Sequence, residues 1–115
     1  SLEVWNESDE EYDKRYVESL TKAAEGNVAE AMYRLSSLYF TGDTVELSID
    51  TGKSYLDRAM ELNFGLAKLS VGINLYHGSN GYPKNLGRSV DIVTEAANDG
   101  VEGAAEVLEK IKTSR

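Results

Sequence analysis

Few residues of this 115-residue chain are of the types that catalyse reactions, and their spacing matches no catalytic motif. The chain has no Cys and a single His, His77, so neither a thiolate nucleophile nor a Cys/His metal site can form. Gly52-Lys53-Ser54 has the residue types that end a phosphate-binding loop, but Leu47 stands where the first Gly is required. We therefore expect no catalytic residue, no metal and no cofactor, and a capping or surface role for His77.

The charge of the chain limits its partners. Asp and Glu number 20 against 12 Lys and Arg, which gives a net charge of −8 at pH 7. Nucleic acids and anionic membrane surfaces both require clustered cations, and no apolar run is long enough to span a bilayer. We expect a protein or peptide partner, with no nucleic acid and no membrane insertion, and self-association stays open.

Two features of the sequence bear on the compartment. The N-terminus lacks the basic region and apolar stretch of a signal peptide, although the chain begins with Ser1 and a removed targeting segment stays open. The lack of Cys is compatible with a reducing compartment. This favours the cytoplasm, and a periplasmic or secreted location stays open.

The sequence contains internal repeats, because small and apolar residues recur about every third of its length. Any binding site must therefore lie on repeated structural elements. Four series recur at spacings of 36 and 37: Ala31, Ala67 and Ala104; Leu35, Val71 and Leu108; Ala23, Ala59 and Ala96; and Leu20, Leu56 and Val93. Gly26, Asn63 and Gly100 recur at a spacing of 37. Such a period is typical of a solenoid, in which each unit buries its apolar face against its neighbours.

Caps and apolar periodicity predict six short helices and no strand. The expected N-caps are Ser8, Asn27, Ser48, Asn63 and Asn85, and the sixth helix begins after Gly100. The first five helices are expected to end at Gly26, Gly42, about Leu62, Gly78 and Asn98. Because Pro83 cannot lie inside a helix, the segment from Gly78 to Lys84 is predicted to be a loop.

Small residues at equivalent positions predict how the two helices of a unit approach. Ser36 and Gly72 lie on the first helix of their units, and Gly52 and Ser89 lie on the second. Side chains of this size allow two helix backbones to come close. We expect Gly72 to pack on the helix that carries Ser89.

These residues resemble the Sel-one-like repeat (SLR) family, α/α solenoids related to tetratricopeptide repeats. One unit reads Ala31, Leu35, Ser36, Tyr39, Gly42, Val45, Gly52 and Ala59, and the next reads Ala67, Val71, Gly72, Leu75, Gly78, Gly81, Tyr82, Pro83, Ser89, Ala96, Ala97 and Gly100. Lys22-Ala23-Ala24-Glu25-Gly26-Asn27 is similar to the end of the family's second helix, whereas Thr44 stands in place of a loop Gly. The resemblance implies an all-α, right-handed α/α superhelix of about six short antiparallel helices.

The repeat frame predicts a single domain over residues 1–115, with two full units between two halves. The predicted bounds are a half repeat at 9–26, repeats at 27–62 and 63–99, and a half repeat at 100–113. Tyr16 stands at the position that Gly52 and Ser89 hold in the full units, and we expect it to cover the end of the solenoid with Trp5. A fragment of a longer array is the alternative.

The resemblance implies a protein-interaction module or adaptor more than an enzyme. In the family the first helix of each unit lines a concave face, and this carries a partner site to ten residues of this chain: Tyr33, Ser37, Phe40, Leu66, Leu69, Ile73, Tyr76, His77, Glu106 and Lys110. The alternative is an enzyme or small-molecule binder that resembles the β-lactam-binding branch of the family. That branch relies on disulfides, which this chain cannot form.

Four of these residues form an unusual second apolar stripe on one helix. Leu66, Leu69, Ile73 and Tyr76 follow one another at spacings of three, four and three residues. A helix that is apolar nearly all round is either buried on both sides or binds something. The stripe is therefore either a partner groove or a surface covered by neighbouring helices, and both interpretations stay open.

Overall fold

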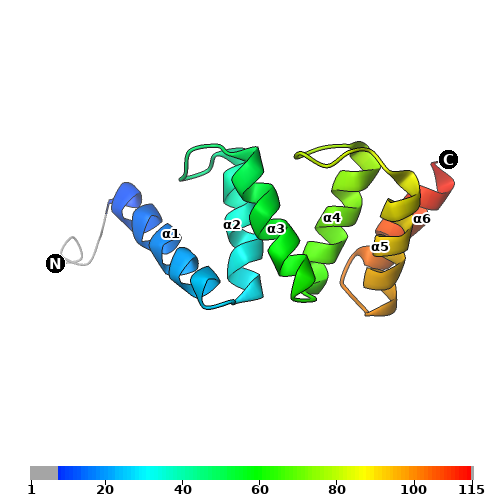
Figure 1. Ribbon diagram of the computed structural model, residues 1–115, viewed down its shortest axis with the longest axis horizontal. Coiled ribbons are helices and arrows are strands. Elements are labelled where there is room, and N and C mark those ends of the chain that lie inside the picture. The colour runs from blue at the N-terminus through cyan, green and yellow to red at the C-terminus, as the bar shows by residue number, and fades with distance from the viewer. Residues whose placement is uncertain (1–7, 115) are drawn as a thin grey trace.

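The computed structural model describes residues 8–114, which form a row of six α-helices (Figure 1). The helices are α1 (Asp9–Glu25), α2 (Ala29–Thr41), α3 (Ile49–Glu61), α4 (Gly65–His77), α5 (Leu86–Asn98) and α6 (Ala104–Thr113). No strand occurs in this part of the chain. The molecule measures 57 × 26 × 26 Å, an elongated shape that follows from stacking units in one direction. The predicted all-α solenoid is confirmed.

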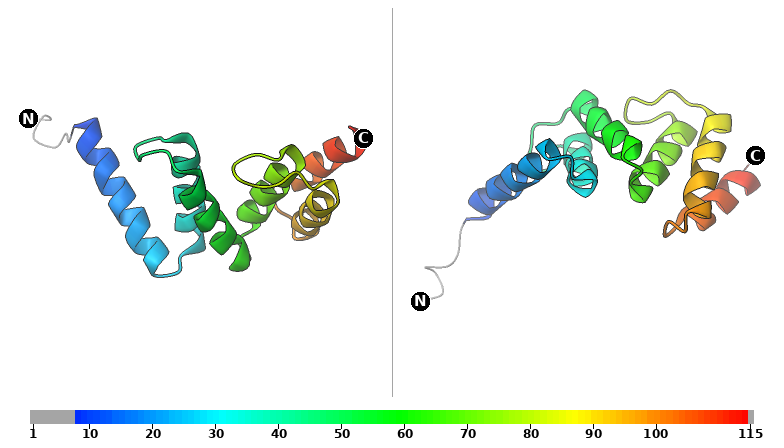
Figure 2. Two further views of the ribbon diagram at one scale, coloured as in Figure 1. Left: turned by 45° about the horizontal axis from the view of Figure 1, so that its top comes forward. Right: turned by 60° about the horizontal axis from the view of Figure 1, so that its bottom comes forward.

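The connections alternate between two kinds. The loops over residues 42–48 and 78–85 lie along one edge of the molecule, and the tight turns before α2, α4 and α6 lie along the opposite edge (Figures 1 and 2). Gly42 and Gly78 end α2 and α4 in the left-handed conformation, with φ of 71° and 68°. Two kinds of connection on opposite edges are what antiparallel helix pairs require.

Three of the helices begin with a side-chain cap. The side chains of Ser8, Ser48 and Asn85 accept hydrogen bonds from the backbone N–H groups three residues further on, at 3.1, 3.2 and 3.0 Å. Each bond satisfies a donor that the first turn of α1, α3 or α5 would otherwise leave unpaired. These three predicted caps are confirmed.

The other two predicted caps are wrong. The N-caps of α2 and α4 are Val28 and Phe64, which make no side-chain cap bond. Asn27 and Asn63 lie one residue earlier, in the left-handed conformation with φ of 65° and 66°. Asn tolerates this conformation better than most residues do, so it serves here in the turn and not as a cap.

The tight turns before α2, α4 and α6 share one geometry. The N–H groups of Val28, Phe64 and Val101 donate to the carbonyls of Ala23, Ala59 and Ala96, at 3.0, 3.1 and 3.0 Å. The residues directly before these donors are Asn27, Asn63 and Gly100, all with positive φ. The equivalent of Asn63 and Gly100 is therefore Asn27, and the predicted alignment with Gly26 is wrong by one residue.

Small residues bring the paired helices together as predicted. The Ser89 hydroxyl on α5 donates to the carbonyl of Gly72 on α4 at 2.6 Å. A Cβ at Gly72 would lie 2.5 Å from Cγ2 of Val93, so α5 leaves no room for a side chain there. In the α2–α3 pair, a Cβ at Gly52 would lie 2.6 Å from the Phe40 ring. Contact between the backbone at these glycines and side chains of the partner helix thus sets the spacing within each pair.

The core is divided into two clusters along the solenoid. The first joins α1, α2, α3 and α4 and contains Ala24, Ala31, Met32, Leu35, Leu56, Ala59, Ala67, Val71, Leu75 and Tyr82. The second joins α4, α5 and α6 and contains Leu69, Val93, Ala96, Ala104 and Ile111. Because α4 contributes buried residues to both clusters, much of its apolar surface is covered by neighbouring helices.

Two polar contacts add to this packing. Tyr82, in the loop before α5, is 6% exposed, and its hydroxyl donates to Oδ1 of Asp57 on α3 at 2.6 Å. Burial and this bond raise the pKa of Tyr82. Lys68 on α4 lies 2.6 Å from a carboxylate oxygen of Glu95 and 3.1 Å from one of Asp99, and the bond to Glu95 raises the pKa of Lys68. The first contact joins successive units, and the second joins the helices within a unit.

Candidate functional site

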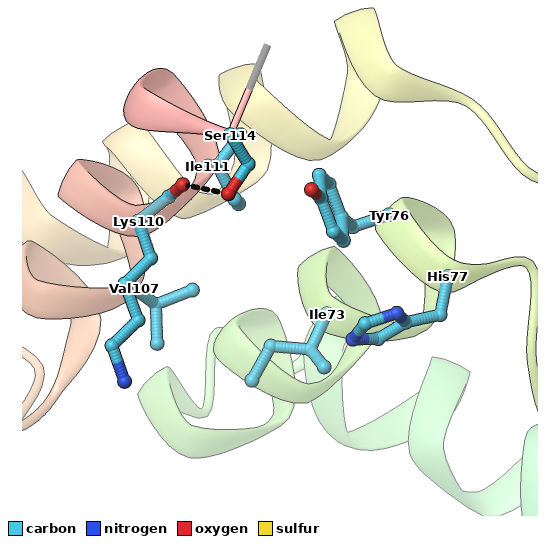
Figure 3. Close-up of a pocket in the computed structure, with 7 residues that line it drawn as sticks. All are labelled: Ile73, Tyr76, His77, Val107, Lys110, Ile111 and Ser114. Atoms are coloured by element: carbon cyan, nitrogen blue, oxygen red, sulfur yellow. Dashed lines mark hydrogen bonds between the residues drawn. The ribbon is translucent and has the colours of Figure 1, made fainter.

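Three shallow cavities follow one another along the first helices of the units, α2, α4 and α6. The first, of about 440 Å³, lies between Tyr16, Arg34, Ser37 and Leu66, and the second, of about 270 Å³, lies between Ser37, Phe40 and Ile73. The third, of about 460 Å³, lies between α4 and α6 (Figure 3). Tyr33 and Ser37 line the first two cavities and Ile73 lines the last two, so the cavities are adjacent to one another. We call this row of three the first-helix groove.

Most of the predicted partner-site residues lie in this groove. The eight that line it are Tyr33, Ser37, Phe40, Leu66, Ile73, Tyr76, His77 and Lys110. Helical periodicity brings them together, because first helices of successive units present equivalent faces in the same direction. Their role in binding remains a prediction, and the geometry supplies a surface on which it can be tested.

Two of the predicted residues lie elsewhere. Leu69 is 9% exposed and belongs to the second core cluster, where its side chain faces Gly103 just before α6. The expectation that Leu69 is accessible to a partner is therefore not met, because the following unit covers this side of α4. Glu106 is exposed on α6 but does not line a cavity of the groove.

A polar network in the second cavity escaped the sequence analysis. Asn74 on α4 is 7% exposed, and its Oδ1 accepts hydrogen bonds from the Ser79 hydroxyl and from Nδ2 of Asn80, both at 2.9 Å. Asn74 and Asn80 both line the cavity. An amide between Ile73 and Leu75 in a mostly apolar helix was the available signal, because a buried amide must find partners.

The first cavity is closed on one side by α1. Tyr16 stacks on Tyr12 with ring centroids 6.5 Å apart, and its hydroxyl accepts a hydrogen bond from Nη1 of Arg34 at 3.4 Å. Arg34 also pairs with Glu30 at 2.9 Å, so the wall of this cavity is polar and internally neutralised. Trp5, which was expected to accompany Tyr16, lies outside the described residues.

The third cavity has an apolar floor and basic walls. Figure 3 shows Ile73 between Lys110 of α6 and His77 of α4, with Tyr76 and Ser114 at the other end. The rings of Tyr76 and His77 meet edge to face with centroids 5.0 Å apart. The Ser114 hydroxyl donates to the carbonyl of Lys110 at 2.6 Å, so it is engaged in closing the helix end.

The described residues of the groove bring together apolar, aromatic and hydrogen-bonding side chains. Within residues 8–114, no hydroxyl is hydrogen-bonded to His77, and no group of three His, Asp or Glu side chains could hold a metal ion. None of the described helices is long and apolar enough to cross a membrane. What the groove can do chemically is accept side chains and hydrogen-bond to a chain laid along it.

Comparisons with known proteins agree with this architecture. No protein-family model matches the chain, and no curated protein sequence matches it. Among solved structures, a Sel1 repeat protein from Oxalobacter formigenes is similar with a TM-score of 0.77 and 26% identity, over 84% of this chain and 71% of that one. Cysteine-rich protein B of Helicobacter pylori is similar with a TM-score of 0.74 and 27% identity, over 83% and 71%.

A third similar structure belongs to a larger protein. It is c5321, a protective antigen present in uropathogenic Escherichia coli strains that displays an SLR fold. Its TM-score is 0.76 at 25% identity, and the match covers 80% of this chain. The chain spans 20% of the length of c5321, so the likeness concerns the repeats and not the whole antigen.

Proposed function

This chain has the Sel1-like repeat fold, and we propose that it is a protein-interaction module that holds a segment of a partner protein in the first-helix groove. Proteins with this fold typically mediate protein interactions. The observation that carries the proposal is the succession of the three cavities across α2, α4 and α6, in which neighbouring cavities share Tyr33, Ser37 or Ile73 as lining residues.

The side chains along the groove are of the kinds that dominate protein interfaces. Tyr33, Phe40 and Tyr76 are only half-buried, so each ring keeps apolar area for a partner. Aromatic side chains contribute large contact areas and are enriched among the residues that determine binding energy. Between the rings, the exposed Ser37 places a hydroxyl that can hydrogen-bond to a partner main chain.

The proposal assigns no catalytic role to the groove. A reaction by nucleophilic catalysis would need a hydroxyl or thiol beside a base, and the Ser114 hydroxyl is bound to a backbone carbonyl instead. The chain has no Cys, so it cannot build the disulfides on which a small-molecule-binding relative of the Cys-rich kind would depend. A binding surface therefore fits these residues better than an active site does.

Filling the groove tests the proposal without disturbing the core. Ser37 is exposed and lines two of the three cavities, so Ser37→Trp would occupy both. Peptides selected from a random library against the parent chain should bind Ser37→Trp at least about tenfold more weakly, because the lost contacts exceed about 1.4 kcal/mol. The measurement is fluorescence anisotropy with the selected peptides.

The matched control is the same substitution on a second helix. Ser54 is exposed on α3 and lines none of the three cavities, so Ser54→Trp should change the affinity by less than about twofold. Circular dichroism of both variants checks that they remain folded. Equal affinity of the selected peptides for the parent chain and Ser37→Trp would place binding elsewhere and overturn the proposal.

A further inference from the structure

Among the residues that the structure describes, the third cavity is lined by a Lys and by no carboxylate, whereas the first is lined by an Arg–Glu pair and the second by no charged side chain. Apolar atoms of Ile73, Tyr76, Val107 and Ile111 line it, and no carboxylate of residues 8–114 does. Its walls carry Lys110 and His77, from the two facing helices (Figure 3). In a chain with a net charge of −8, a largely apolar cavity whose charged lining residue is a Lys differs from the average surface.

The polar groups of this cavity are available for a ligand. Within residues 8–114, the Lys110 ammonium makes no ion pair and the Tyr76 hydroxyl makes no hydrogen bond. Both groups donate hydrogen bonds, and an ammonium has no acceptor at all. A ligand that satisfies them must therefore bring acceptors, and a carboxylate is the acceptor that a cation binds best.

A structural role in ending α6 does not by itself account for Lys110. Lys110 and Lys112 both lie in the last turn of α6, where either cation complements the negative end of the helix dipole. Only Lys110 lines the cavity. Glu106, one turn earlier on α6, does not line it and forms no ion pair with Lys110. Of these two lysines, Lys110 is thus the one on the cavity side of the helix.

We propose that this cavity binds an acidic, apolar segment within the partner chain, with an apolar side chain against Ile73 and Val107 and a neighbouring Asp or Glu carboxylate held by Lys110 and His77. The proposal rests on the proposed function and names the chemistry of the partner. The first-helix groove would then bind a segment in which acidic and apolar residues are adjacent.

The net negative charge of the chain does not prevent such binding. At about 0.15 M ionic strength the Debye length is about 8 Å, so carboxylates elsewhere on the 57 Å molecule are largely screened from the cavity. A contact over an apolar floor is screened less than one in open solvent. The Lys110 cation on the wall of the cavity therefore favours a carboxylate there.

Short peptides of alternating Leu and Asp, acetylated and amidated at their ends, provide the probe. Their binding to the full chain is measured by fluorescence anisotropy at about 0.15 M ionic strength. We expect the Asp peptide to bind at least about tenfold more tightly than its Asn counterpart. Equal binding of the two peptides, or binding that appears only when the peptide has a free C-terminal carboxylate, would overturn the proposal of an internal acidic segment.

Two charge reversals on the same helix turn locate the site. Lys110→Glu should lower the affinity for the Asp peptide by at least about tenfold. Lys112→Glu changes the net charge equally but lies outside the cavity, and it should lower this affinity by less than about twofold. Equal losses in the two variants would show a general charge effect and overturn the proposal. Melting temperatures of both variants verify that α6 remains folded.

A pair of bulky substitutions tests the apolar part independently. Val107→Trp fills the cavity, whereas Ala105→Trp adds the same ring to an exposed position of α6 outside it. We expect only the first to abolish binding of the Asp peptide, and equal effects would count against the cavity. If the Asp peptide does not bind the parent chain, while Ser37→Trp still weakens the binding of library-selected peptides, this inference is wrong and the proposed function stands. If the Asp peptide does not bind and Ser37→Trp does not weaken the binding of the selected peptides, the inference and the proposed function are both wrong.

Discussion

The Tyr82 hydroxyl joins the loop of one unit to the second helix of the unit before it. Tyr82→Phe removes the bond to Asp57 at 2.6 Å, while Lys53 remains 2.9 Å from the same carboxylate. We expect the free energy of unfolding to fall by about 1 kcal/mol, the usual worth of one such bond. Urea denaturation at neutral pH measures it, and a stability equal to that of the parent chain would show that the bond contributes nothing.

Alkaline pH gives a second readout of the same residue. Burial and the bond to Asp57 raise the pKa of Tyr82 in the folded chain, whereas an unfolded Tyr loses its proton near about pH 10. The contribution of Tyr82 to the free energy of unfolding is therefore complete below about pH 10 and is lost as the pH rises above it. Lys68, whose pKa the bond to Glu95 raises, acts in the same direction.

The parent chain should thus lose stability above about pH 10, and Tyr82→Phe should lose it less steeply. Lys68→Met serves as the control that removes only the contribution of Lys68. The measurement is urea denaturation at a series of alkaline pH values. An identical pH dependence in the parent chain and Tyr82→Phe would contradict the assignment.

Thr44 holds a backbone conformation that its side chain disfavours. Its φ is 63°, and a β-branched residue in the left-handed region is strained. Because Thr44 stands where the SLR pattern has a loop Gly, Thr44→Gly should raise the free energy of unfolding by about 1 kcal/mol. Asp43→Gly, at a neighbour without positive φ, should instead lower it or leave it unchanged. The two urea midpoints shifting together would argue against strain at Thr44.

At the residue scale, the sequence predicts a cap well only where the side chain alone decides. Ser48 and Asn85 lie directly before apolar helical patterns, and both cap helices. Asn27 and Asn63 have the same appearance, but Asn is favoured both at N-caps and in the left-handed conformation. The bond from the next residue's N–H to the preceding helix selects the second role, and no local pattern reveals that bond.

At the scale of helix pairs, two glycines of the same unit should respond oppositely to the same change. A Cβ at Gly72 would lie 2.5 Å from Val93, whereas a Cβ at Gly87 in α5 would meet only Oδ1 of Asn85 at 3.8 Å. Gly72→Ala should lower the free energy of unfolding by about 1–3 kcal/mol through overpacking. Gly87→Ala should raise it by about 0.5–1 kcal/mol through helix propensity.

Thermal melting of these two variants measures the difference. Because the chemical change is identical, the comparison isolates the space that the partner helix leaves. A stabilised Gly72→Ala variant would mean that α4 and α5 do not approach as closely as the structure shows.

Helical periodicity also explains which partner-site residues could be predicted. It fixes the face of each first helix, and so it brought Tyr33 and Phe40 together with Ile73 and Tyr76. It could not show which neighbour covers which stripe of α4, and Leu69 is covered while Ile73, four residues later, is half-exposed. Burial between non-adjacent helices depends on the angle at which successive units stack, and a periodic sequence pattern does not specify this angle.

At the scale of the whole molecule, two core clusters share one helix. Residues of α4 such as Val71 and Leu75 belong to the first cluster, and Leu69 belongs to the second. In a solenoid each unit contacts only its neighbours, so stability is nearly a sum of local terms. Damage at one end should therefore spread weakly to the other end.

Ile111 provides the test of this independence, because it is 3% exposed and lies in the second cluster. Ile111→Ala should cost about 2–5 kcal/mol locally. Hydrogen exchange should accelerate in α5 and α6 and change little in α2 and α3. Equal acceleration along the chain would instead show that the six helices unfold as one unit.

Local loosening has a functional consequence, since Ile111 lines the third cavity and neither of the others. The variant should then lose affinity for acidic peptides while peptides held by the first two cavities still bind.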